Sequence, residues 1–389
     1  MEVKTGYKQT ELGIIPEEWD VVALGELATI ERGKFSARPR NDPKYYGGET
    51  PFLQTGDITR SGCKVTTFSQ TLNKEGIKVS RVFPRGTLFF TIAANIGDVG
   101  IADFAAACPD SLVAFSPHAG TEKKWLLYEL FRHKESFEAL ASPGAQLNIN
   151  LEKLRPFRVR VPTNTEQRAI AQVLSDVDAL ITALDRLIAK KRDIKKATLQ
   201  QLLTGKTRLP GFSGAWEQTQ MRDLITRLKK TSRLSASGKD EGIYPFFTNT
   251  TKPVERFLDE SDFETEAIIA NTGGEAYFNY YKGRFAAMSD CLVFESKVDT
   301  RFLYYLLKLS EHNINSNGFT GSGIKHLDKK YFEQIEVCCP VQAQEQTAIA
   351  NVLSDMDSEI SALEARHDKT RALKQGMMQE LLTGKTRLL

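Results

Sequence analysis

The sequence predicts an α+β protein in which two globular blocks are separated by two long antiparallel coiled-coil helices, with an approximate two-fold axis relating the halves. Three observations predict this architecture. A nearly identical helical segment occurs twice, the region before each copy repeats loosely, and both regions mix short β-rich runs with helical ones. The expected organisation is block, helix, block, helix, with boundaries at 1–165, 166–208, 209–344 and 345–389.

Length and composition are consistent with more than one domain. The chain has 389 residues, 41% of them hydrophobic and 26% charged, enough to bury two cores. A formal net charge of +3 is too small to name a partner, so a basic surface has to be local. Five cysteines without CxxC spacing suit a reducing compartment, and the first residues contain no apolar signal segment. We therefore expect a cytoplasmic protein with no membrane association.

The repeated segment runs from Glu166 to Arg208 and again from Glu345 to Arg387. The copies, EQRAIAQVLSDVD and EQTAIANVLSDMD at their starts, align without a gap, and about 24 of 43 positions are identical. Both copies end in LLTGKTRL, where Gly205 and Gly384 are expected to close each helix in the left-handed conformation. The first helix, over about 38 residues, would be roughly 57 Å long at ~1.5 Å per residue.

Apolar residues in both copies recur at alternating spacings of three and four, which is typical of a coiled-coil seam. The predicted seam of the first copy is Ile170, Val173, Val177, Leu180, Leu184, Leu187 and Ile194. The predicted seam of the second copy is Ile349, Val352, Met356, Leu363, Leu373 and Met377. Glu359, Arg366 and Thr370 interrupt the second seam, so we expect looser packing there. If the first helix leads away from the first block, the second must run back to bury its seam on the first.

The two blocks carry matching strand and helix patterns. Strands are expected around RVFPRGTLFFTIAA, SLVAFSP, RPFRVRVP, AIIANTGG and QIEVCCP, and helices at TEKKWLLYELF and DTRFLYYLLK. Trp19 has a counterpart in Trp216, and PFLQTGDI, PDSLVAF and WLLYELF have counterparts in PFFTNT, SDCLVFE and FLYYLLK. Each block is therefore expected to be α+β.

Motifs for catalysis are weak. Pro109-Asp110 and Glu122-Lys123-Lys124 fit the PD-(D/E)xK spacing of metal-dependent nucleases, but the second acid opens a predicted helix and not a strand. GKT lacks the earlier glycine of a phosphate loop and follows a helix instead of preceding one. The five histidines have no metal-ligand spacing, and no S-adenosylmethionine motif is present. We expect no catalytic residue, no metal and no bound cofactor in this chain.

Basic loops in both blocks are typical of nucleic-acid contacts, because Lys and Arg neutralise phosphates and Arg, Asn and Gln can read base edges. A solvated surface loop is the alternative for each. The candidates in the first block are Arg32, Lys34, Arg38, Arg40, Lys44, Tyr45 and Tyr46. Those in the second block are Arg227, Lys229, Lys230, Arg233 and Lys239. Secondary candidates in two polar loops are Gln146, Asn148, Lys325 and His326.

The helical segments repeat their positive charges as well. The blocks diverged while the helices did not, so we expect the helices to dock two copies of one partner; a charged face kept for solubility is the alternative. The candidate docking residues are Lys190, Arg192, Lys195, Lys206, Arg208, Lys369, Arg371, Lys374, Lys385 and Arg387.

The opening GYKQTELGIIPEEWDVVALGEL, the EQRAIAQVLSDVD segment and the duplicated LLTGKTR resemble the specificity subunit of type I restriction–modification systems over the whole chain. The resemblance implies two target recognition domains, each reading one half of a bipartite, asymmetric duplex DNA site, with the coiled coil setting the spacer. It also implies two docked methyltransferase (modification) subunits and separate restriction/translocase subunits. S-adenosylmethionine, ATP and Mg²⁺ are then expected on those partners only. A coiled-coil scaffold spacing two protein-binding domains, without DNA readout, is the competing hypothesis.

Overall fold

The computed structural model describes residues 5–141, 148–252, 254–323 and 325–388. The chain forms two compact units, and each helix of the repeat is shared between them. Unit 1 contains residues 1–183 and 367–389, and unit 2 contains residues 184–366. Unit 1 is therefore built from both ends of the sequence.

Unit 1 is a mixed α/β unit around a five-stranded sheet in the order β4-β12-β9-β10-β6. A four-stranded sheet, β7-β5-β11-β8, and the pairs β1-β2 and β3-β13 complete it. The strands are β1 (Tyr7–Thr10), β2 (Gly13–Pro16), β3 (Asp20–Ala23), β4 (Ala28–Arg32), β5 (Tyr46–Phe52), β6 (Lys64–Val65), β7 (Gln70–Leu72), β8 (Val82–Phe83), β9 (Leu88–Thr91), β10 (Val99–Ala102), β11 (Ala106–Ala107), β12 (Leu112–Pro117) and β13 (Arg158–Val161). The helices are α1 (Leu24–Leu27), α2 (Thr55–Ser61), α3 (Lys74–Lys78), α4 (Lys123–Arg132), α5 (Lys134–Leu140) and α6 (Leu151–Leu154), with a 3₁₀ turn η1 (Pro43–Tyr45).

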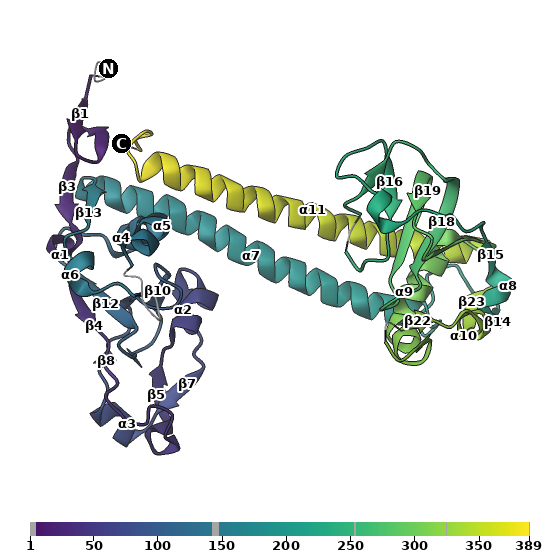
Figure 1. Cartoon of the computed structure of the whole chain (residues 1–389), viewed down its shortest axis with the longest axis horizontal. Helices are drawn as coiled ribbons and strands as arrows, with labels where there is room; N and C mark the ends of the chain where they lie inside the picture. Colours follow the sequence, from purple (N-terminus) through teal and green to yellow (C-terminus); the bar gives the residue numbers. More distant parts are fainter. Residues whose placement is uncertain (1–4, 142–147, 253, 324, 389) are drawn as a thin grey trace. The chain divides into compact units, whose positions relative to one another are not determined.

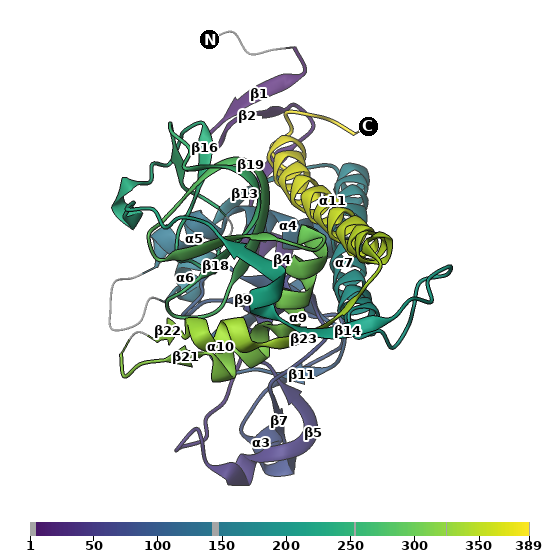
Figure 2. The ribbon, with the colours of Figure 1, turned by 90° about the vertical axis from the view of Figure 1, so that its right-hand side faces the viewer.

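Unit 2 is built around a six-stranded sheet in the order β15-β20-β18-β19-β16-β17, and α9 packs against its three central strands (Figure 2). Two further strand pairs are β14-β23 and β21-β22. The strands are β14 (Trp216–Gln220), β15 (Ile225–Arg227), β16 (Tyr244–Phe247), β17 (Phe257–Leu258), β18 (Phe263–Asn271), β19 (Phe278–Ala287), β20 (Cys291–Ser296), β21 (Phe319–Thr320), β22 (His326–Leu327) and β23 (Glu336–Pro340). The helices are α8 (Met221–Leu224), α9 (Thr300–Asn317) and α10 (Lys329–Gln334), with a 3₁₀ turn η2 (Ser235–Ser237).

The loose repeat predicted between the blocks is confirmed in the topology of the two units. Trp19 immediately precedes β3 and Trp216 begins β14. Each of these strands pairs with the strand that leads into a long helix, β3 with β13 and β14 with β23. Phe52 pairs with Ala107 in parallel, as Phe247 pairs with Ala287. The order β4-β12-β9-β10 in unit 1 corresponds to β15-β20-β18-β19 in unit 2, and α4 to α9. The predicted strands and helices are therefore present at matching places.

The repeated segments form α7 (Asn164–Leu202) and α11 (Ala343–Leu381), each 39 residues long (Figure 1). In unit 1 the start of α7 lies beside the end of α11, and Asp178 pairs with Lys374. In unit 2 the end of α7 lies beside the start of α11, where partner numbers fall as α7 numbers rise, from Arg192–Glu364 to Arg208–Glu345. Within each unit the two helical segments are therefore antiparallel. Gly205 and Gly384 have φ of 68° and 74°, as predicted for helix-closing glycines.

The predicted seam is only partly correct. Ile170, Leu184 and Ile349 are buried, and Val173, Val177, Val352, Met356, Leu363 and Met377 are partly buried. Leu180, Leu187, Ile194 and Leu373, however, are 39%, 39%, 42% and 58% exposed. Several side chains one residue after a predicted seam position pack inward instead, among them Leu174, Ile188, Leu353 and Ile360. The predicted stripe and the stripe that packs inward both have alternating spacings of three and four residues. They share every second position, and at the other positions the inward stripe lies one residue later.

Polar interruptions of the second helix have separate explanations. Thr370 does lie on the inward side and is 8% exposed. Glu359 lies on the outer edge, where its carboxylate reaches Lys191 Nζ at 2.6 Å. The looser packing predicted at Glu359 is thus replaced by an ion pair within unit 2.

Candidate functional site

The predicted basic loops lie at the same end of the central sheet in each unit. In unit 1 the loop follows β4, and in unit 2 it follows β15, so Arg32 and Arg227 are the last residues of equivalent strands. Because neighbouring strands are antiparallel, the ends of β4 and β9 meet the starts of β12 and β10 at one edge of the sheet. The corresponding edge in unit 2 is formed by β15, β20, β18 and β19.

The loop of unit 1 is fixed on an aromatic cluster. Phe35, Tyr45, Tyr46 and Phe52 pack together, with ring centroids of Phe35 and Phe52 4.9 Å apart. Arg40 Nη2 donates to both carboxylate oxygens of Asp110 at 2.9 Å. Burial would raise the pKa of Asp110, but the hydrogen bond and charge of Arg40 outweigh it, so this pKa is lowered. The loop therefore has a defined shape before any ligand binds.

Cations of the unit 1 loop differ in how far they are engaged by the chain itself. Lys44 pairs with Asp42 at 3.1 Å, and Arg32 Nε donates to the Asp110 carbonyl at 2.6 Å. Among the described residues, Arg38 donates only to backbone carbonyls, including that of Ala37 at 2.7 Å, and no acid there neutralises its charge. Within the described ranges, Lys34 Nζ has no side-chain partner. Lys34 and Arg38 are consequently better candidates for binding an anionic ligand than Lys44 and Arg40, which are paired with acids.

In the loop of unit 2, as in unit 1, acidic side chains neutralise some of the cations and not others. Arg233 Nε donates to Asp262 at 2.7 Å, Lys239 Nζ pairs with Asp259 at 2.6 Å, and Arg227 pairs with Glu333 at 2.7 Å. These acids come from outside the loop, which is why the loop looked wholly unneutralised in the sequence.

Two lysines of this loop remain unpaired and line a pocket. Lys229 and Lys230 are exposed and have no ion pair among the residues the structure covers. Together with Arg227 and Lys329 they border a pocket of about 170 Å³ at the loop end of the sheet. Lys329 was missed in the sequence because it lies about a hundred residues downstream, and no local pattern links it to this loop.

The secondary candidates lie beside the turn at this same end of each sheet. Asn148 forms a bridge with Ala93, and His326 forms the corresponding bridge with Gly273. Lys325 is exposed, and its carbonyl accepts from the Gly274 N–H at 2.8 Å. Gln146 lies outside the described residues.

The nuclease motif is not assembled as that chemistry requires. Glu122 caps the start of α4 and accepts from the Lys124 N–H, while Lys123 Nζ donates to the Gly86 carbonyl at 2.7 Å. Asp110 is engaged by Arg40. Glu122 thus opens a helix, as the sequence predicted. Within the described ranges, no group of three or more His, Cys, Asp or Glu residues is placed to hold a metal ion.

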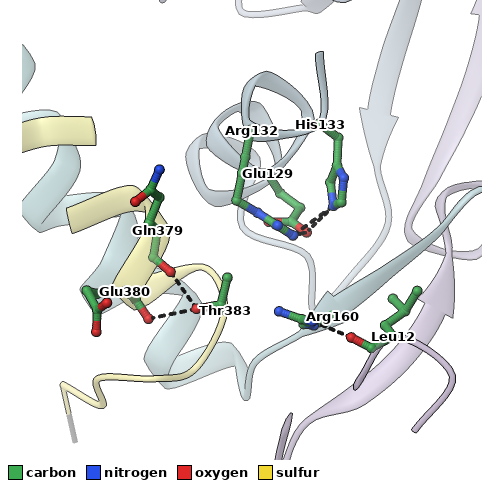
Figure 3. Close-up of polar contacts among 8 residues, drawn as sticks. All are labelled: Leu12, Glu129, Arg132, His133, Arg160, Gln379, Glu380 and Thr383. Atoms are coloured by element: carbon green, nitrogen blue, oxygen red, sulfur yellow. Dashed lines mark hydrogen bonds and ion pairs between the residues drawn. The ribbon is translucent and has the colours of Figure 1, made fainter. Parts of the chain in front are cut away.

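Unit 1 contains a buried cluster in which a glutamate is held by an arginine and a histidine of the same chain segment (Figure 3). Glu129 is fully buried, and its carboxylate accepts from Arg132 Nη2 at 2.6 Å and contacts His133 Nε2 at 3.1 Å. Burial alone would raise the pKa of Glu129, but the charge of Arg132 and the hydrogen bonds outweigh it and lower this pKa. In the same view Arg160 donates to the Leu12 carbonyl, and Thr383 to Gln379 and Glu380.

Two of the free thiols, those of Cys63 and Cys291, are not activated. Burial raises the pKa of the Cys63 and Cys291 thiols to about 12, so both stay protonated near neutral pH.

The two long helices end in matching ion pairs. Glu166, which is 1% exposed, accepts from Arg387 Nε at 2.6 Å and from Trp19 Nε1 at 2.8 Å. The hydrogen bond that Arg387 donates to Glu166 raises the pKa of Arg387. Glu345, which is 0% exposed, accepts from Arg208 Nε at 2.5 Å and Nη2 at 2.6 Å. Each LLTGKTR segment therefore ends on the start of the other long helix.

A second matching cluster joins each long helix pair to its block. Tyr128 OH donates to Asp178 at 2.7 Å, Lys374 Nζ reaches the same carboxylate at 2.6 Å, and this ammonium lies 5.2 Å from the tyrosine ring centroid. In unit 2, Tyr305 OH donates to Asp357 at 2.8 Å, and Lys195 pairs with that carboxylate 5.5 Å from the ring centroid. The repeat of Asp and Lys in both copies thus has an intramolecular cause.

The predicted docking residues divide accordingly. Lys195, Arg208, Lys374 and Arg387 stabilise this chain's own fold, and Arg192 pairs with Glu364. The remaining candidates, Lys190, Lys206, Lys369, Arg371 and Lys385, are exposed. Partner docking stays a prediction for these five.

Residues 16–195 and 214–371 match the family described as Type I restriction modification DNA specificity domain. The two matches cover most of the chain and include both loop clusters. The chain belongs to this family.

Relatives of this specificity-domain chain carry consistent names. The MjaX type I restriction enzyme specificity subunit of Methanocaldococcus jannaschii is 26% identical over 98% of this chain and 97% of its own length. The EcoDI type I specificity subunit of Escherichia coli is 29% identical over 43% of this chain and 37% of its own length. The first match spans both units, so the relationship is not confined to one block.

Solved structures share the fold of this specificity-domain chain. The S subunit of the type I restriction–modification system from M. genitalium matches with a TM-score of 0.67 and 16% identity, covering 98% of both chains. A chain from a study of type I assembly and conformational transition matches with a TM-score of 0.55 and 14% identity, covering 96% of this chain and 99% of the other. No helix in the described ranges is both long and apolar enough to cross a lipid bilayer.

Proposed function

We propose that this chain is the DNA specificity subunit of a type I restriction–modification complex and that each unit reads one half of a bipartite, asymmetric duplex site. The observation that carries the proposal is the cationic loop cluster at the same end of equivalent sheets in both units. The sheets match, but the loops differ in sequence and in their ion pairs. The half-sites they bind should therefore differ.

The division between paired and unpaired cations suggests how each cluster works. Arg40 and Arg233 are held by Asp110 and Asp262, so they fix the loop shape. The unneutralised side chains, Arg38 in unit 1 and Lys229 and Lys230 in unit 2, would replace counterions on phosphates or reach base edges. A loop whose shape is fixed by such ion pairs loses less conformational entropy on binding.

The long helices would act as the spacer between the two readers, as an antiparallel coiled coil whose length fixes the separation of half-sites. Two methyltransferase subunits would dock on the helices, and restriction/translocase subunits would join for cleavage. In this proposal catalysis, S-adenosylmethionine, ATP and Mg²⁺ belong to those subunits, and this chain contributes recognition alone. The absence of an assembled nuclease motif at Asp110 and Glu122 is consistent with that division of roles.

The decisive experiment is to map methylated adenines across the genome of cells that express the methyltransferase subunit with and without this chain. The expected result is one bipartite motif with two unlike half-sites and a fixed spacer, present only with this chain. Methylation that does not depend on this chain, together with a purified complex that shows no salt-dependent duplex binding, would favour the scaffold hypothesis.

A second measurement tests the spacer. Adding one helical turn to both α7 and α11 would lengthen the spacer by about one or two base pairs, since a turn rises ~5.4 Å and a base pair ~3.4 Å. Both half-sites should stay unchanged. A spacer of unaltered length would refute the role of the helices.

A further inference from the structure

A pocket of about 390 Å³ lies in unit 1 between the cationic loop and the end of β5, which is a volume typical of small-molecule sites. Its apolar lining is Phe35, Tyr46 and Phe52, and its polar lining includes the amides of Asn41, Gln54 and Gln70. None of these three amide residues was predicted as a candidate from the sequence, because they lie in three separate segments. The pocket combines flat aromatic side chains with hydrogen-bonding groups.

The aromatic part of the pocket is formed before any ligand binds. Phe35 and Phe52 are 3% and 1% exposed, and the ring centroids of Phe35 and Tyr46 are 5.8 Å apart. The Tyr46 hydroxyl donates to the Arg40 carbonyl, and Asp110 holds the Arg40 guanidinium. The rings are therefore fixed both by their own packing and by the loop.

The two glutamines of the pocket are positioned by one buried acid. Asp57, which is 3% exposed, accepts from the Gln54 N–H at 2.8 Å and from the Ser69 hydroxyl at 3.0 Å. Gln54 Nε2 in turn donates to Gln70 Oε1 at 3.2 Å. Gln54 follows β5 and Gln70 begins β7, and these two strands are neighbours in the four-stranded sheet (Figure 1). The glutamines are thus held side by side, although 16 residues separate them.

Hydrogen-bonding capacity remains free at this pocket. Among the described residues, the amide nitrogen of Gln70 and the whole amide of Asn41 make no hydrogen bond. An amide side chain suits adenine, because it accepts from the amino group of the base and donates to a ring nitrogen. The pocket therefore offers both an apolar surface and a matching edge to an adenine.

Unit 2 has no equivalent of this arrangement within its described residues. Asn249 stands two residues after Phe247, as Gln54 stands two residues after Phe52 in the matching strand. Asn249, however, donates to the Gly273 carbonyl at 2.9 Å and accepts from the Gly273 N–H at 3.3 Å. The pocket beside Phe247 has a volume of only about 140 Å³. Any ligand of this kind should therefore bind to unit 1.

We propose that the pocket of unit 1 binds one adenine that is turned out of the DNA duplex, with Asn41 and Gln70 on its edge and the aromatic cluster against its face. This inference rests on the proposed function, because the cationic loop that would hold the phosphates also borders the pocket. It adds to that function a way of selecting one base of the half-site outside the duplex.

The aromatic lining favours an extruded base over a paired one. A paired base presents only its edge in a groove, since its faces are covered by the neighbouring base pairs, so it would gain nothing from these rings. An extruded base exposes its faces and its pairing edge together. Phe68, two residues before Gln70, is 42% exposed and lies 5.3 Å from the Phe104 ring between centroids. It supplies an apolar side chain that can fill the gap left in the stack.

The test uses the full chain in complex with the methyltransferase subunit and duplexes that contain the mapped bipartite site. Each A·T pair of both half-sites is replaced in turn by an A·C mismatch, which keeps the adenine and removes its partner, and Kd is measured for every duplex. The methylated adenines are left out of the scan, because a methyltransferase extrudes its own target base.

We expect one mismatch, in one half-site only, to tighten binding by about threefold or more, because an unpaired base costs less to extrude. All other mismatches should weaken binding. Gln70→Ala and Asn41→Ala should each abolish this tightening and weaken binding to the matched duplex by about fivefold. Gln9→Ala is the matched control, since Gln9 is an exposed glutamine of the same unit outside the pocket. It should leave both values unchanged, and thermal unfolding confirms that each variant is folded.

A scan in which no mismatch tightens binding would overturn the proposal. So would a tightening that persists in both pocket variants, or one that Gln9→Ala also removes. If Gln70→Ala relaxes the choice of base at a position where mismatches only weaken binding, Gln70 reads a paired base and the pocket holds none.

Failure of the proposed function would look different. In that case the complex would show no salt-dependent binding to the matched duplex, and methylation would not depend on this chain. If the complex binds the duplex and directs bipartite methylation but no mismatch tightens binding, only the adenine pocket is wrong.

Discussion

The matched ion pairs at the helix ends offer a comparison of two buried carboxylates with different numbers of partners. Glu166 accepts from both Arg387 and Trp19, whereas Arg208 supplies both hydrogen bonds that Glu345 accepts among the described side chains. Replacing either arginine by methionine keeps the aliphatic stem but leaves a carboxylate buried without its cation. Breaking a buried pair in this way typically costs about 3–5 kcal/mol in the free energy of unfolding.

The remaining hydrogen bond decides the difference between the two substitutions. A hydrogen bond to a charged group contributes about 1.5–3 kcal/mol, so the indole N–H of Trp19 should partly compensate Glu166 when Arg387 is lost. We therefore expect Arg208→Met to lower the free energy of unfolding by about 4 kcal/mol and Arg387→Met by about 2 kcal/mol. Urea denaturation followed by circular dichroism measures both, with separate fits where the units unfold separately.

The double variant Arg208→Met with Glu345→Leu serves as the control. Because most of the cost comes from the uncompensated carboxylate, this variant should regain most of the stability that Arg208→Met loses. Equal costs for the two arginine substitutions, or a double variant no more stable than the single one, would refute the reasoning.

Three further predictions address the loop, the buried acid and the seam. Lys230→Ala should weaken binding to one half-site without affecting the other, and Lys239→Ala should have a smaller effect because Lys239 pairs with Asp259; binding to duplexes altered in one half-site at a time tests this. Glu129→Gln should destabilise the protein near pH 7, and the difference should shrink as pH falls below the ordinary pKa of about 4.5, since a lowered folded-state pKa contributes stability that is lost on acidification; unfolding at several pH values checks the sign. Ile188→Ala should lower the free energy of unfolding by about 3 kcal/mol and Leu187→Ala by less than about 1 kcal/mol, and denaturation curves that reverse this order would restore the original seam.

The positions and types of most elements could be predicted from the sequence, because the repeat and the strand patterns are local features. The inward face of the helices was misjudged because Leu180 and Ile181, or Leu187 and Ile188, are adjacent apolar residues that satisfy two heptad stripes. The second copy distinguishes the two stripes, because the predicted stripe contains Glu359 there, whereas the correct stripe contains Ile360. Glu359 in the predicted seam was therefore a sign of the wrong stripe, whereas Thr370 belongs to both stripes and is buried.

The candidate site was harder to predict for a different reason. Loops at equivalent places in both blocks were visible in the sequence, but which cations remain free depends on acids that the fold brings from far away. Asp110 reaches Arg40 across 70 residues, and Glu333 reaches Arg227 across about a hundred. No local pattern distinguishes Lys230, which has no ion pair within the part of the chain that the structure describes, from Lys239, which pairs with Asp259.

The composition of unit 1 from both ends of the chain has a consequence for biosynthesis. Unit 2 uses one continuous stretch, 184–366, so it can fold while translation continues. Unit 1 must wait for the segment after residue 366, which supplies the Arg387 partner of Glu166 and the Lys374 partner of Asp178. Translation that stops before this segment would therefore release a chain with a folded unit 2 and an incomplete unit 1. In that product Glu166 and the apolar surface of α7, which are buried in the complete unit, would be accessible to proteases and chaperones.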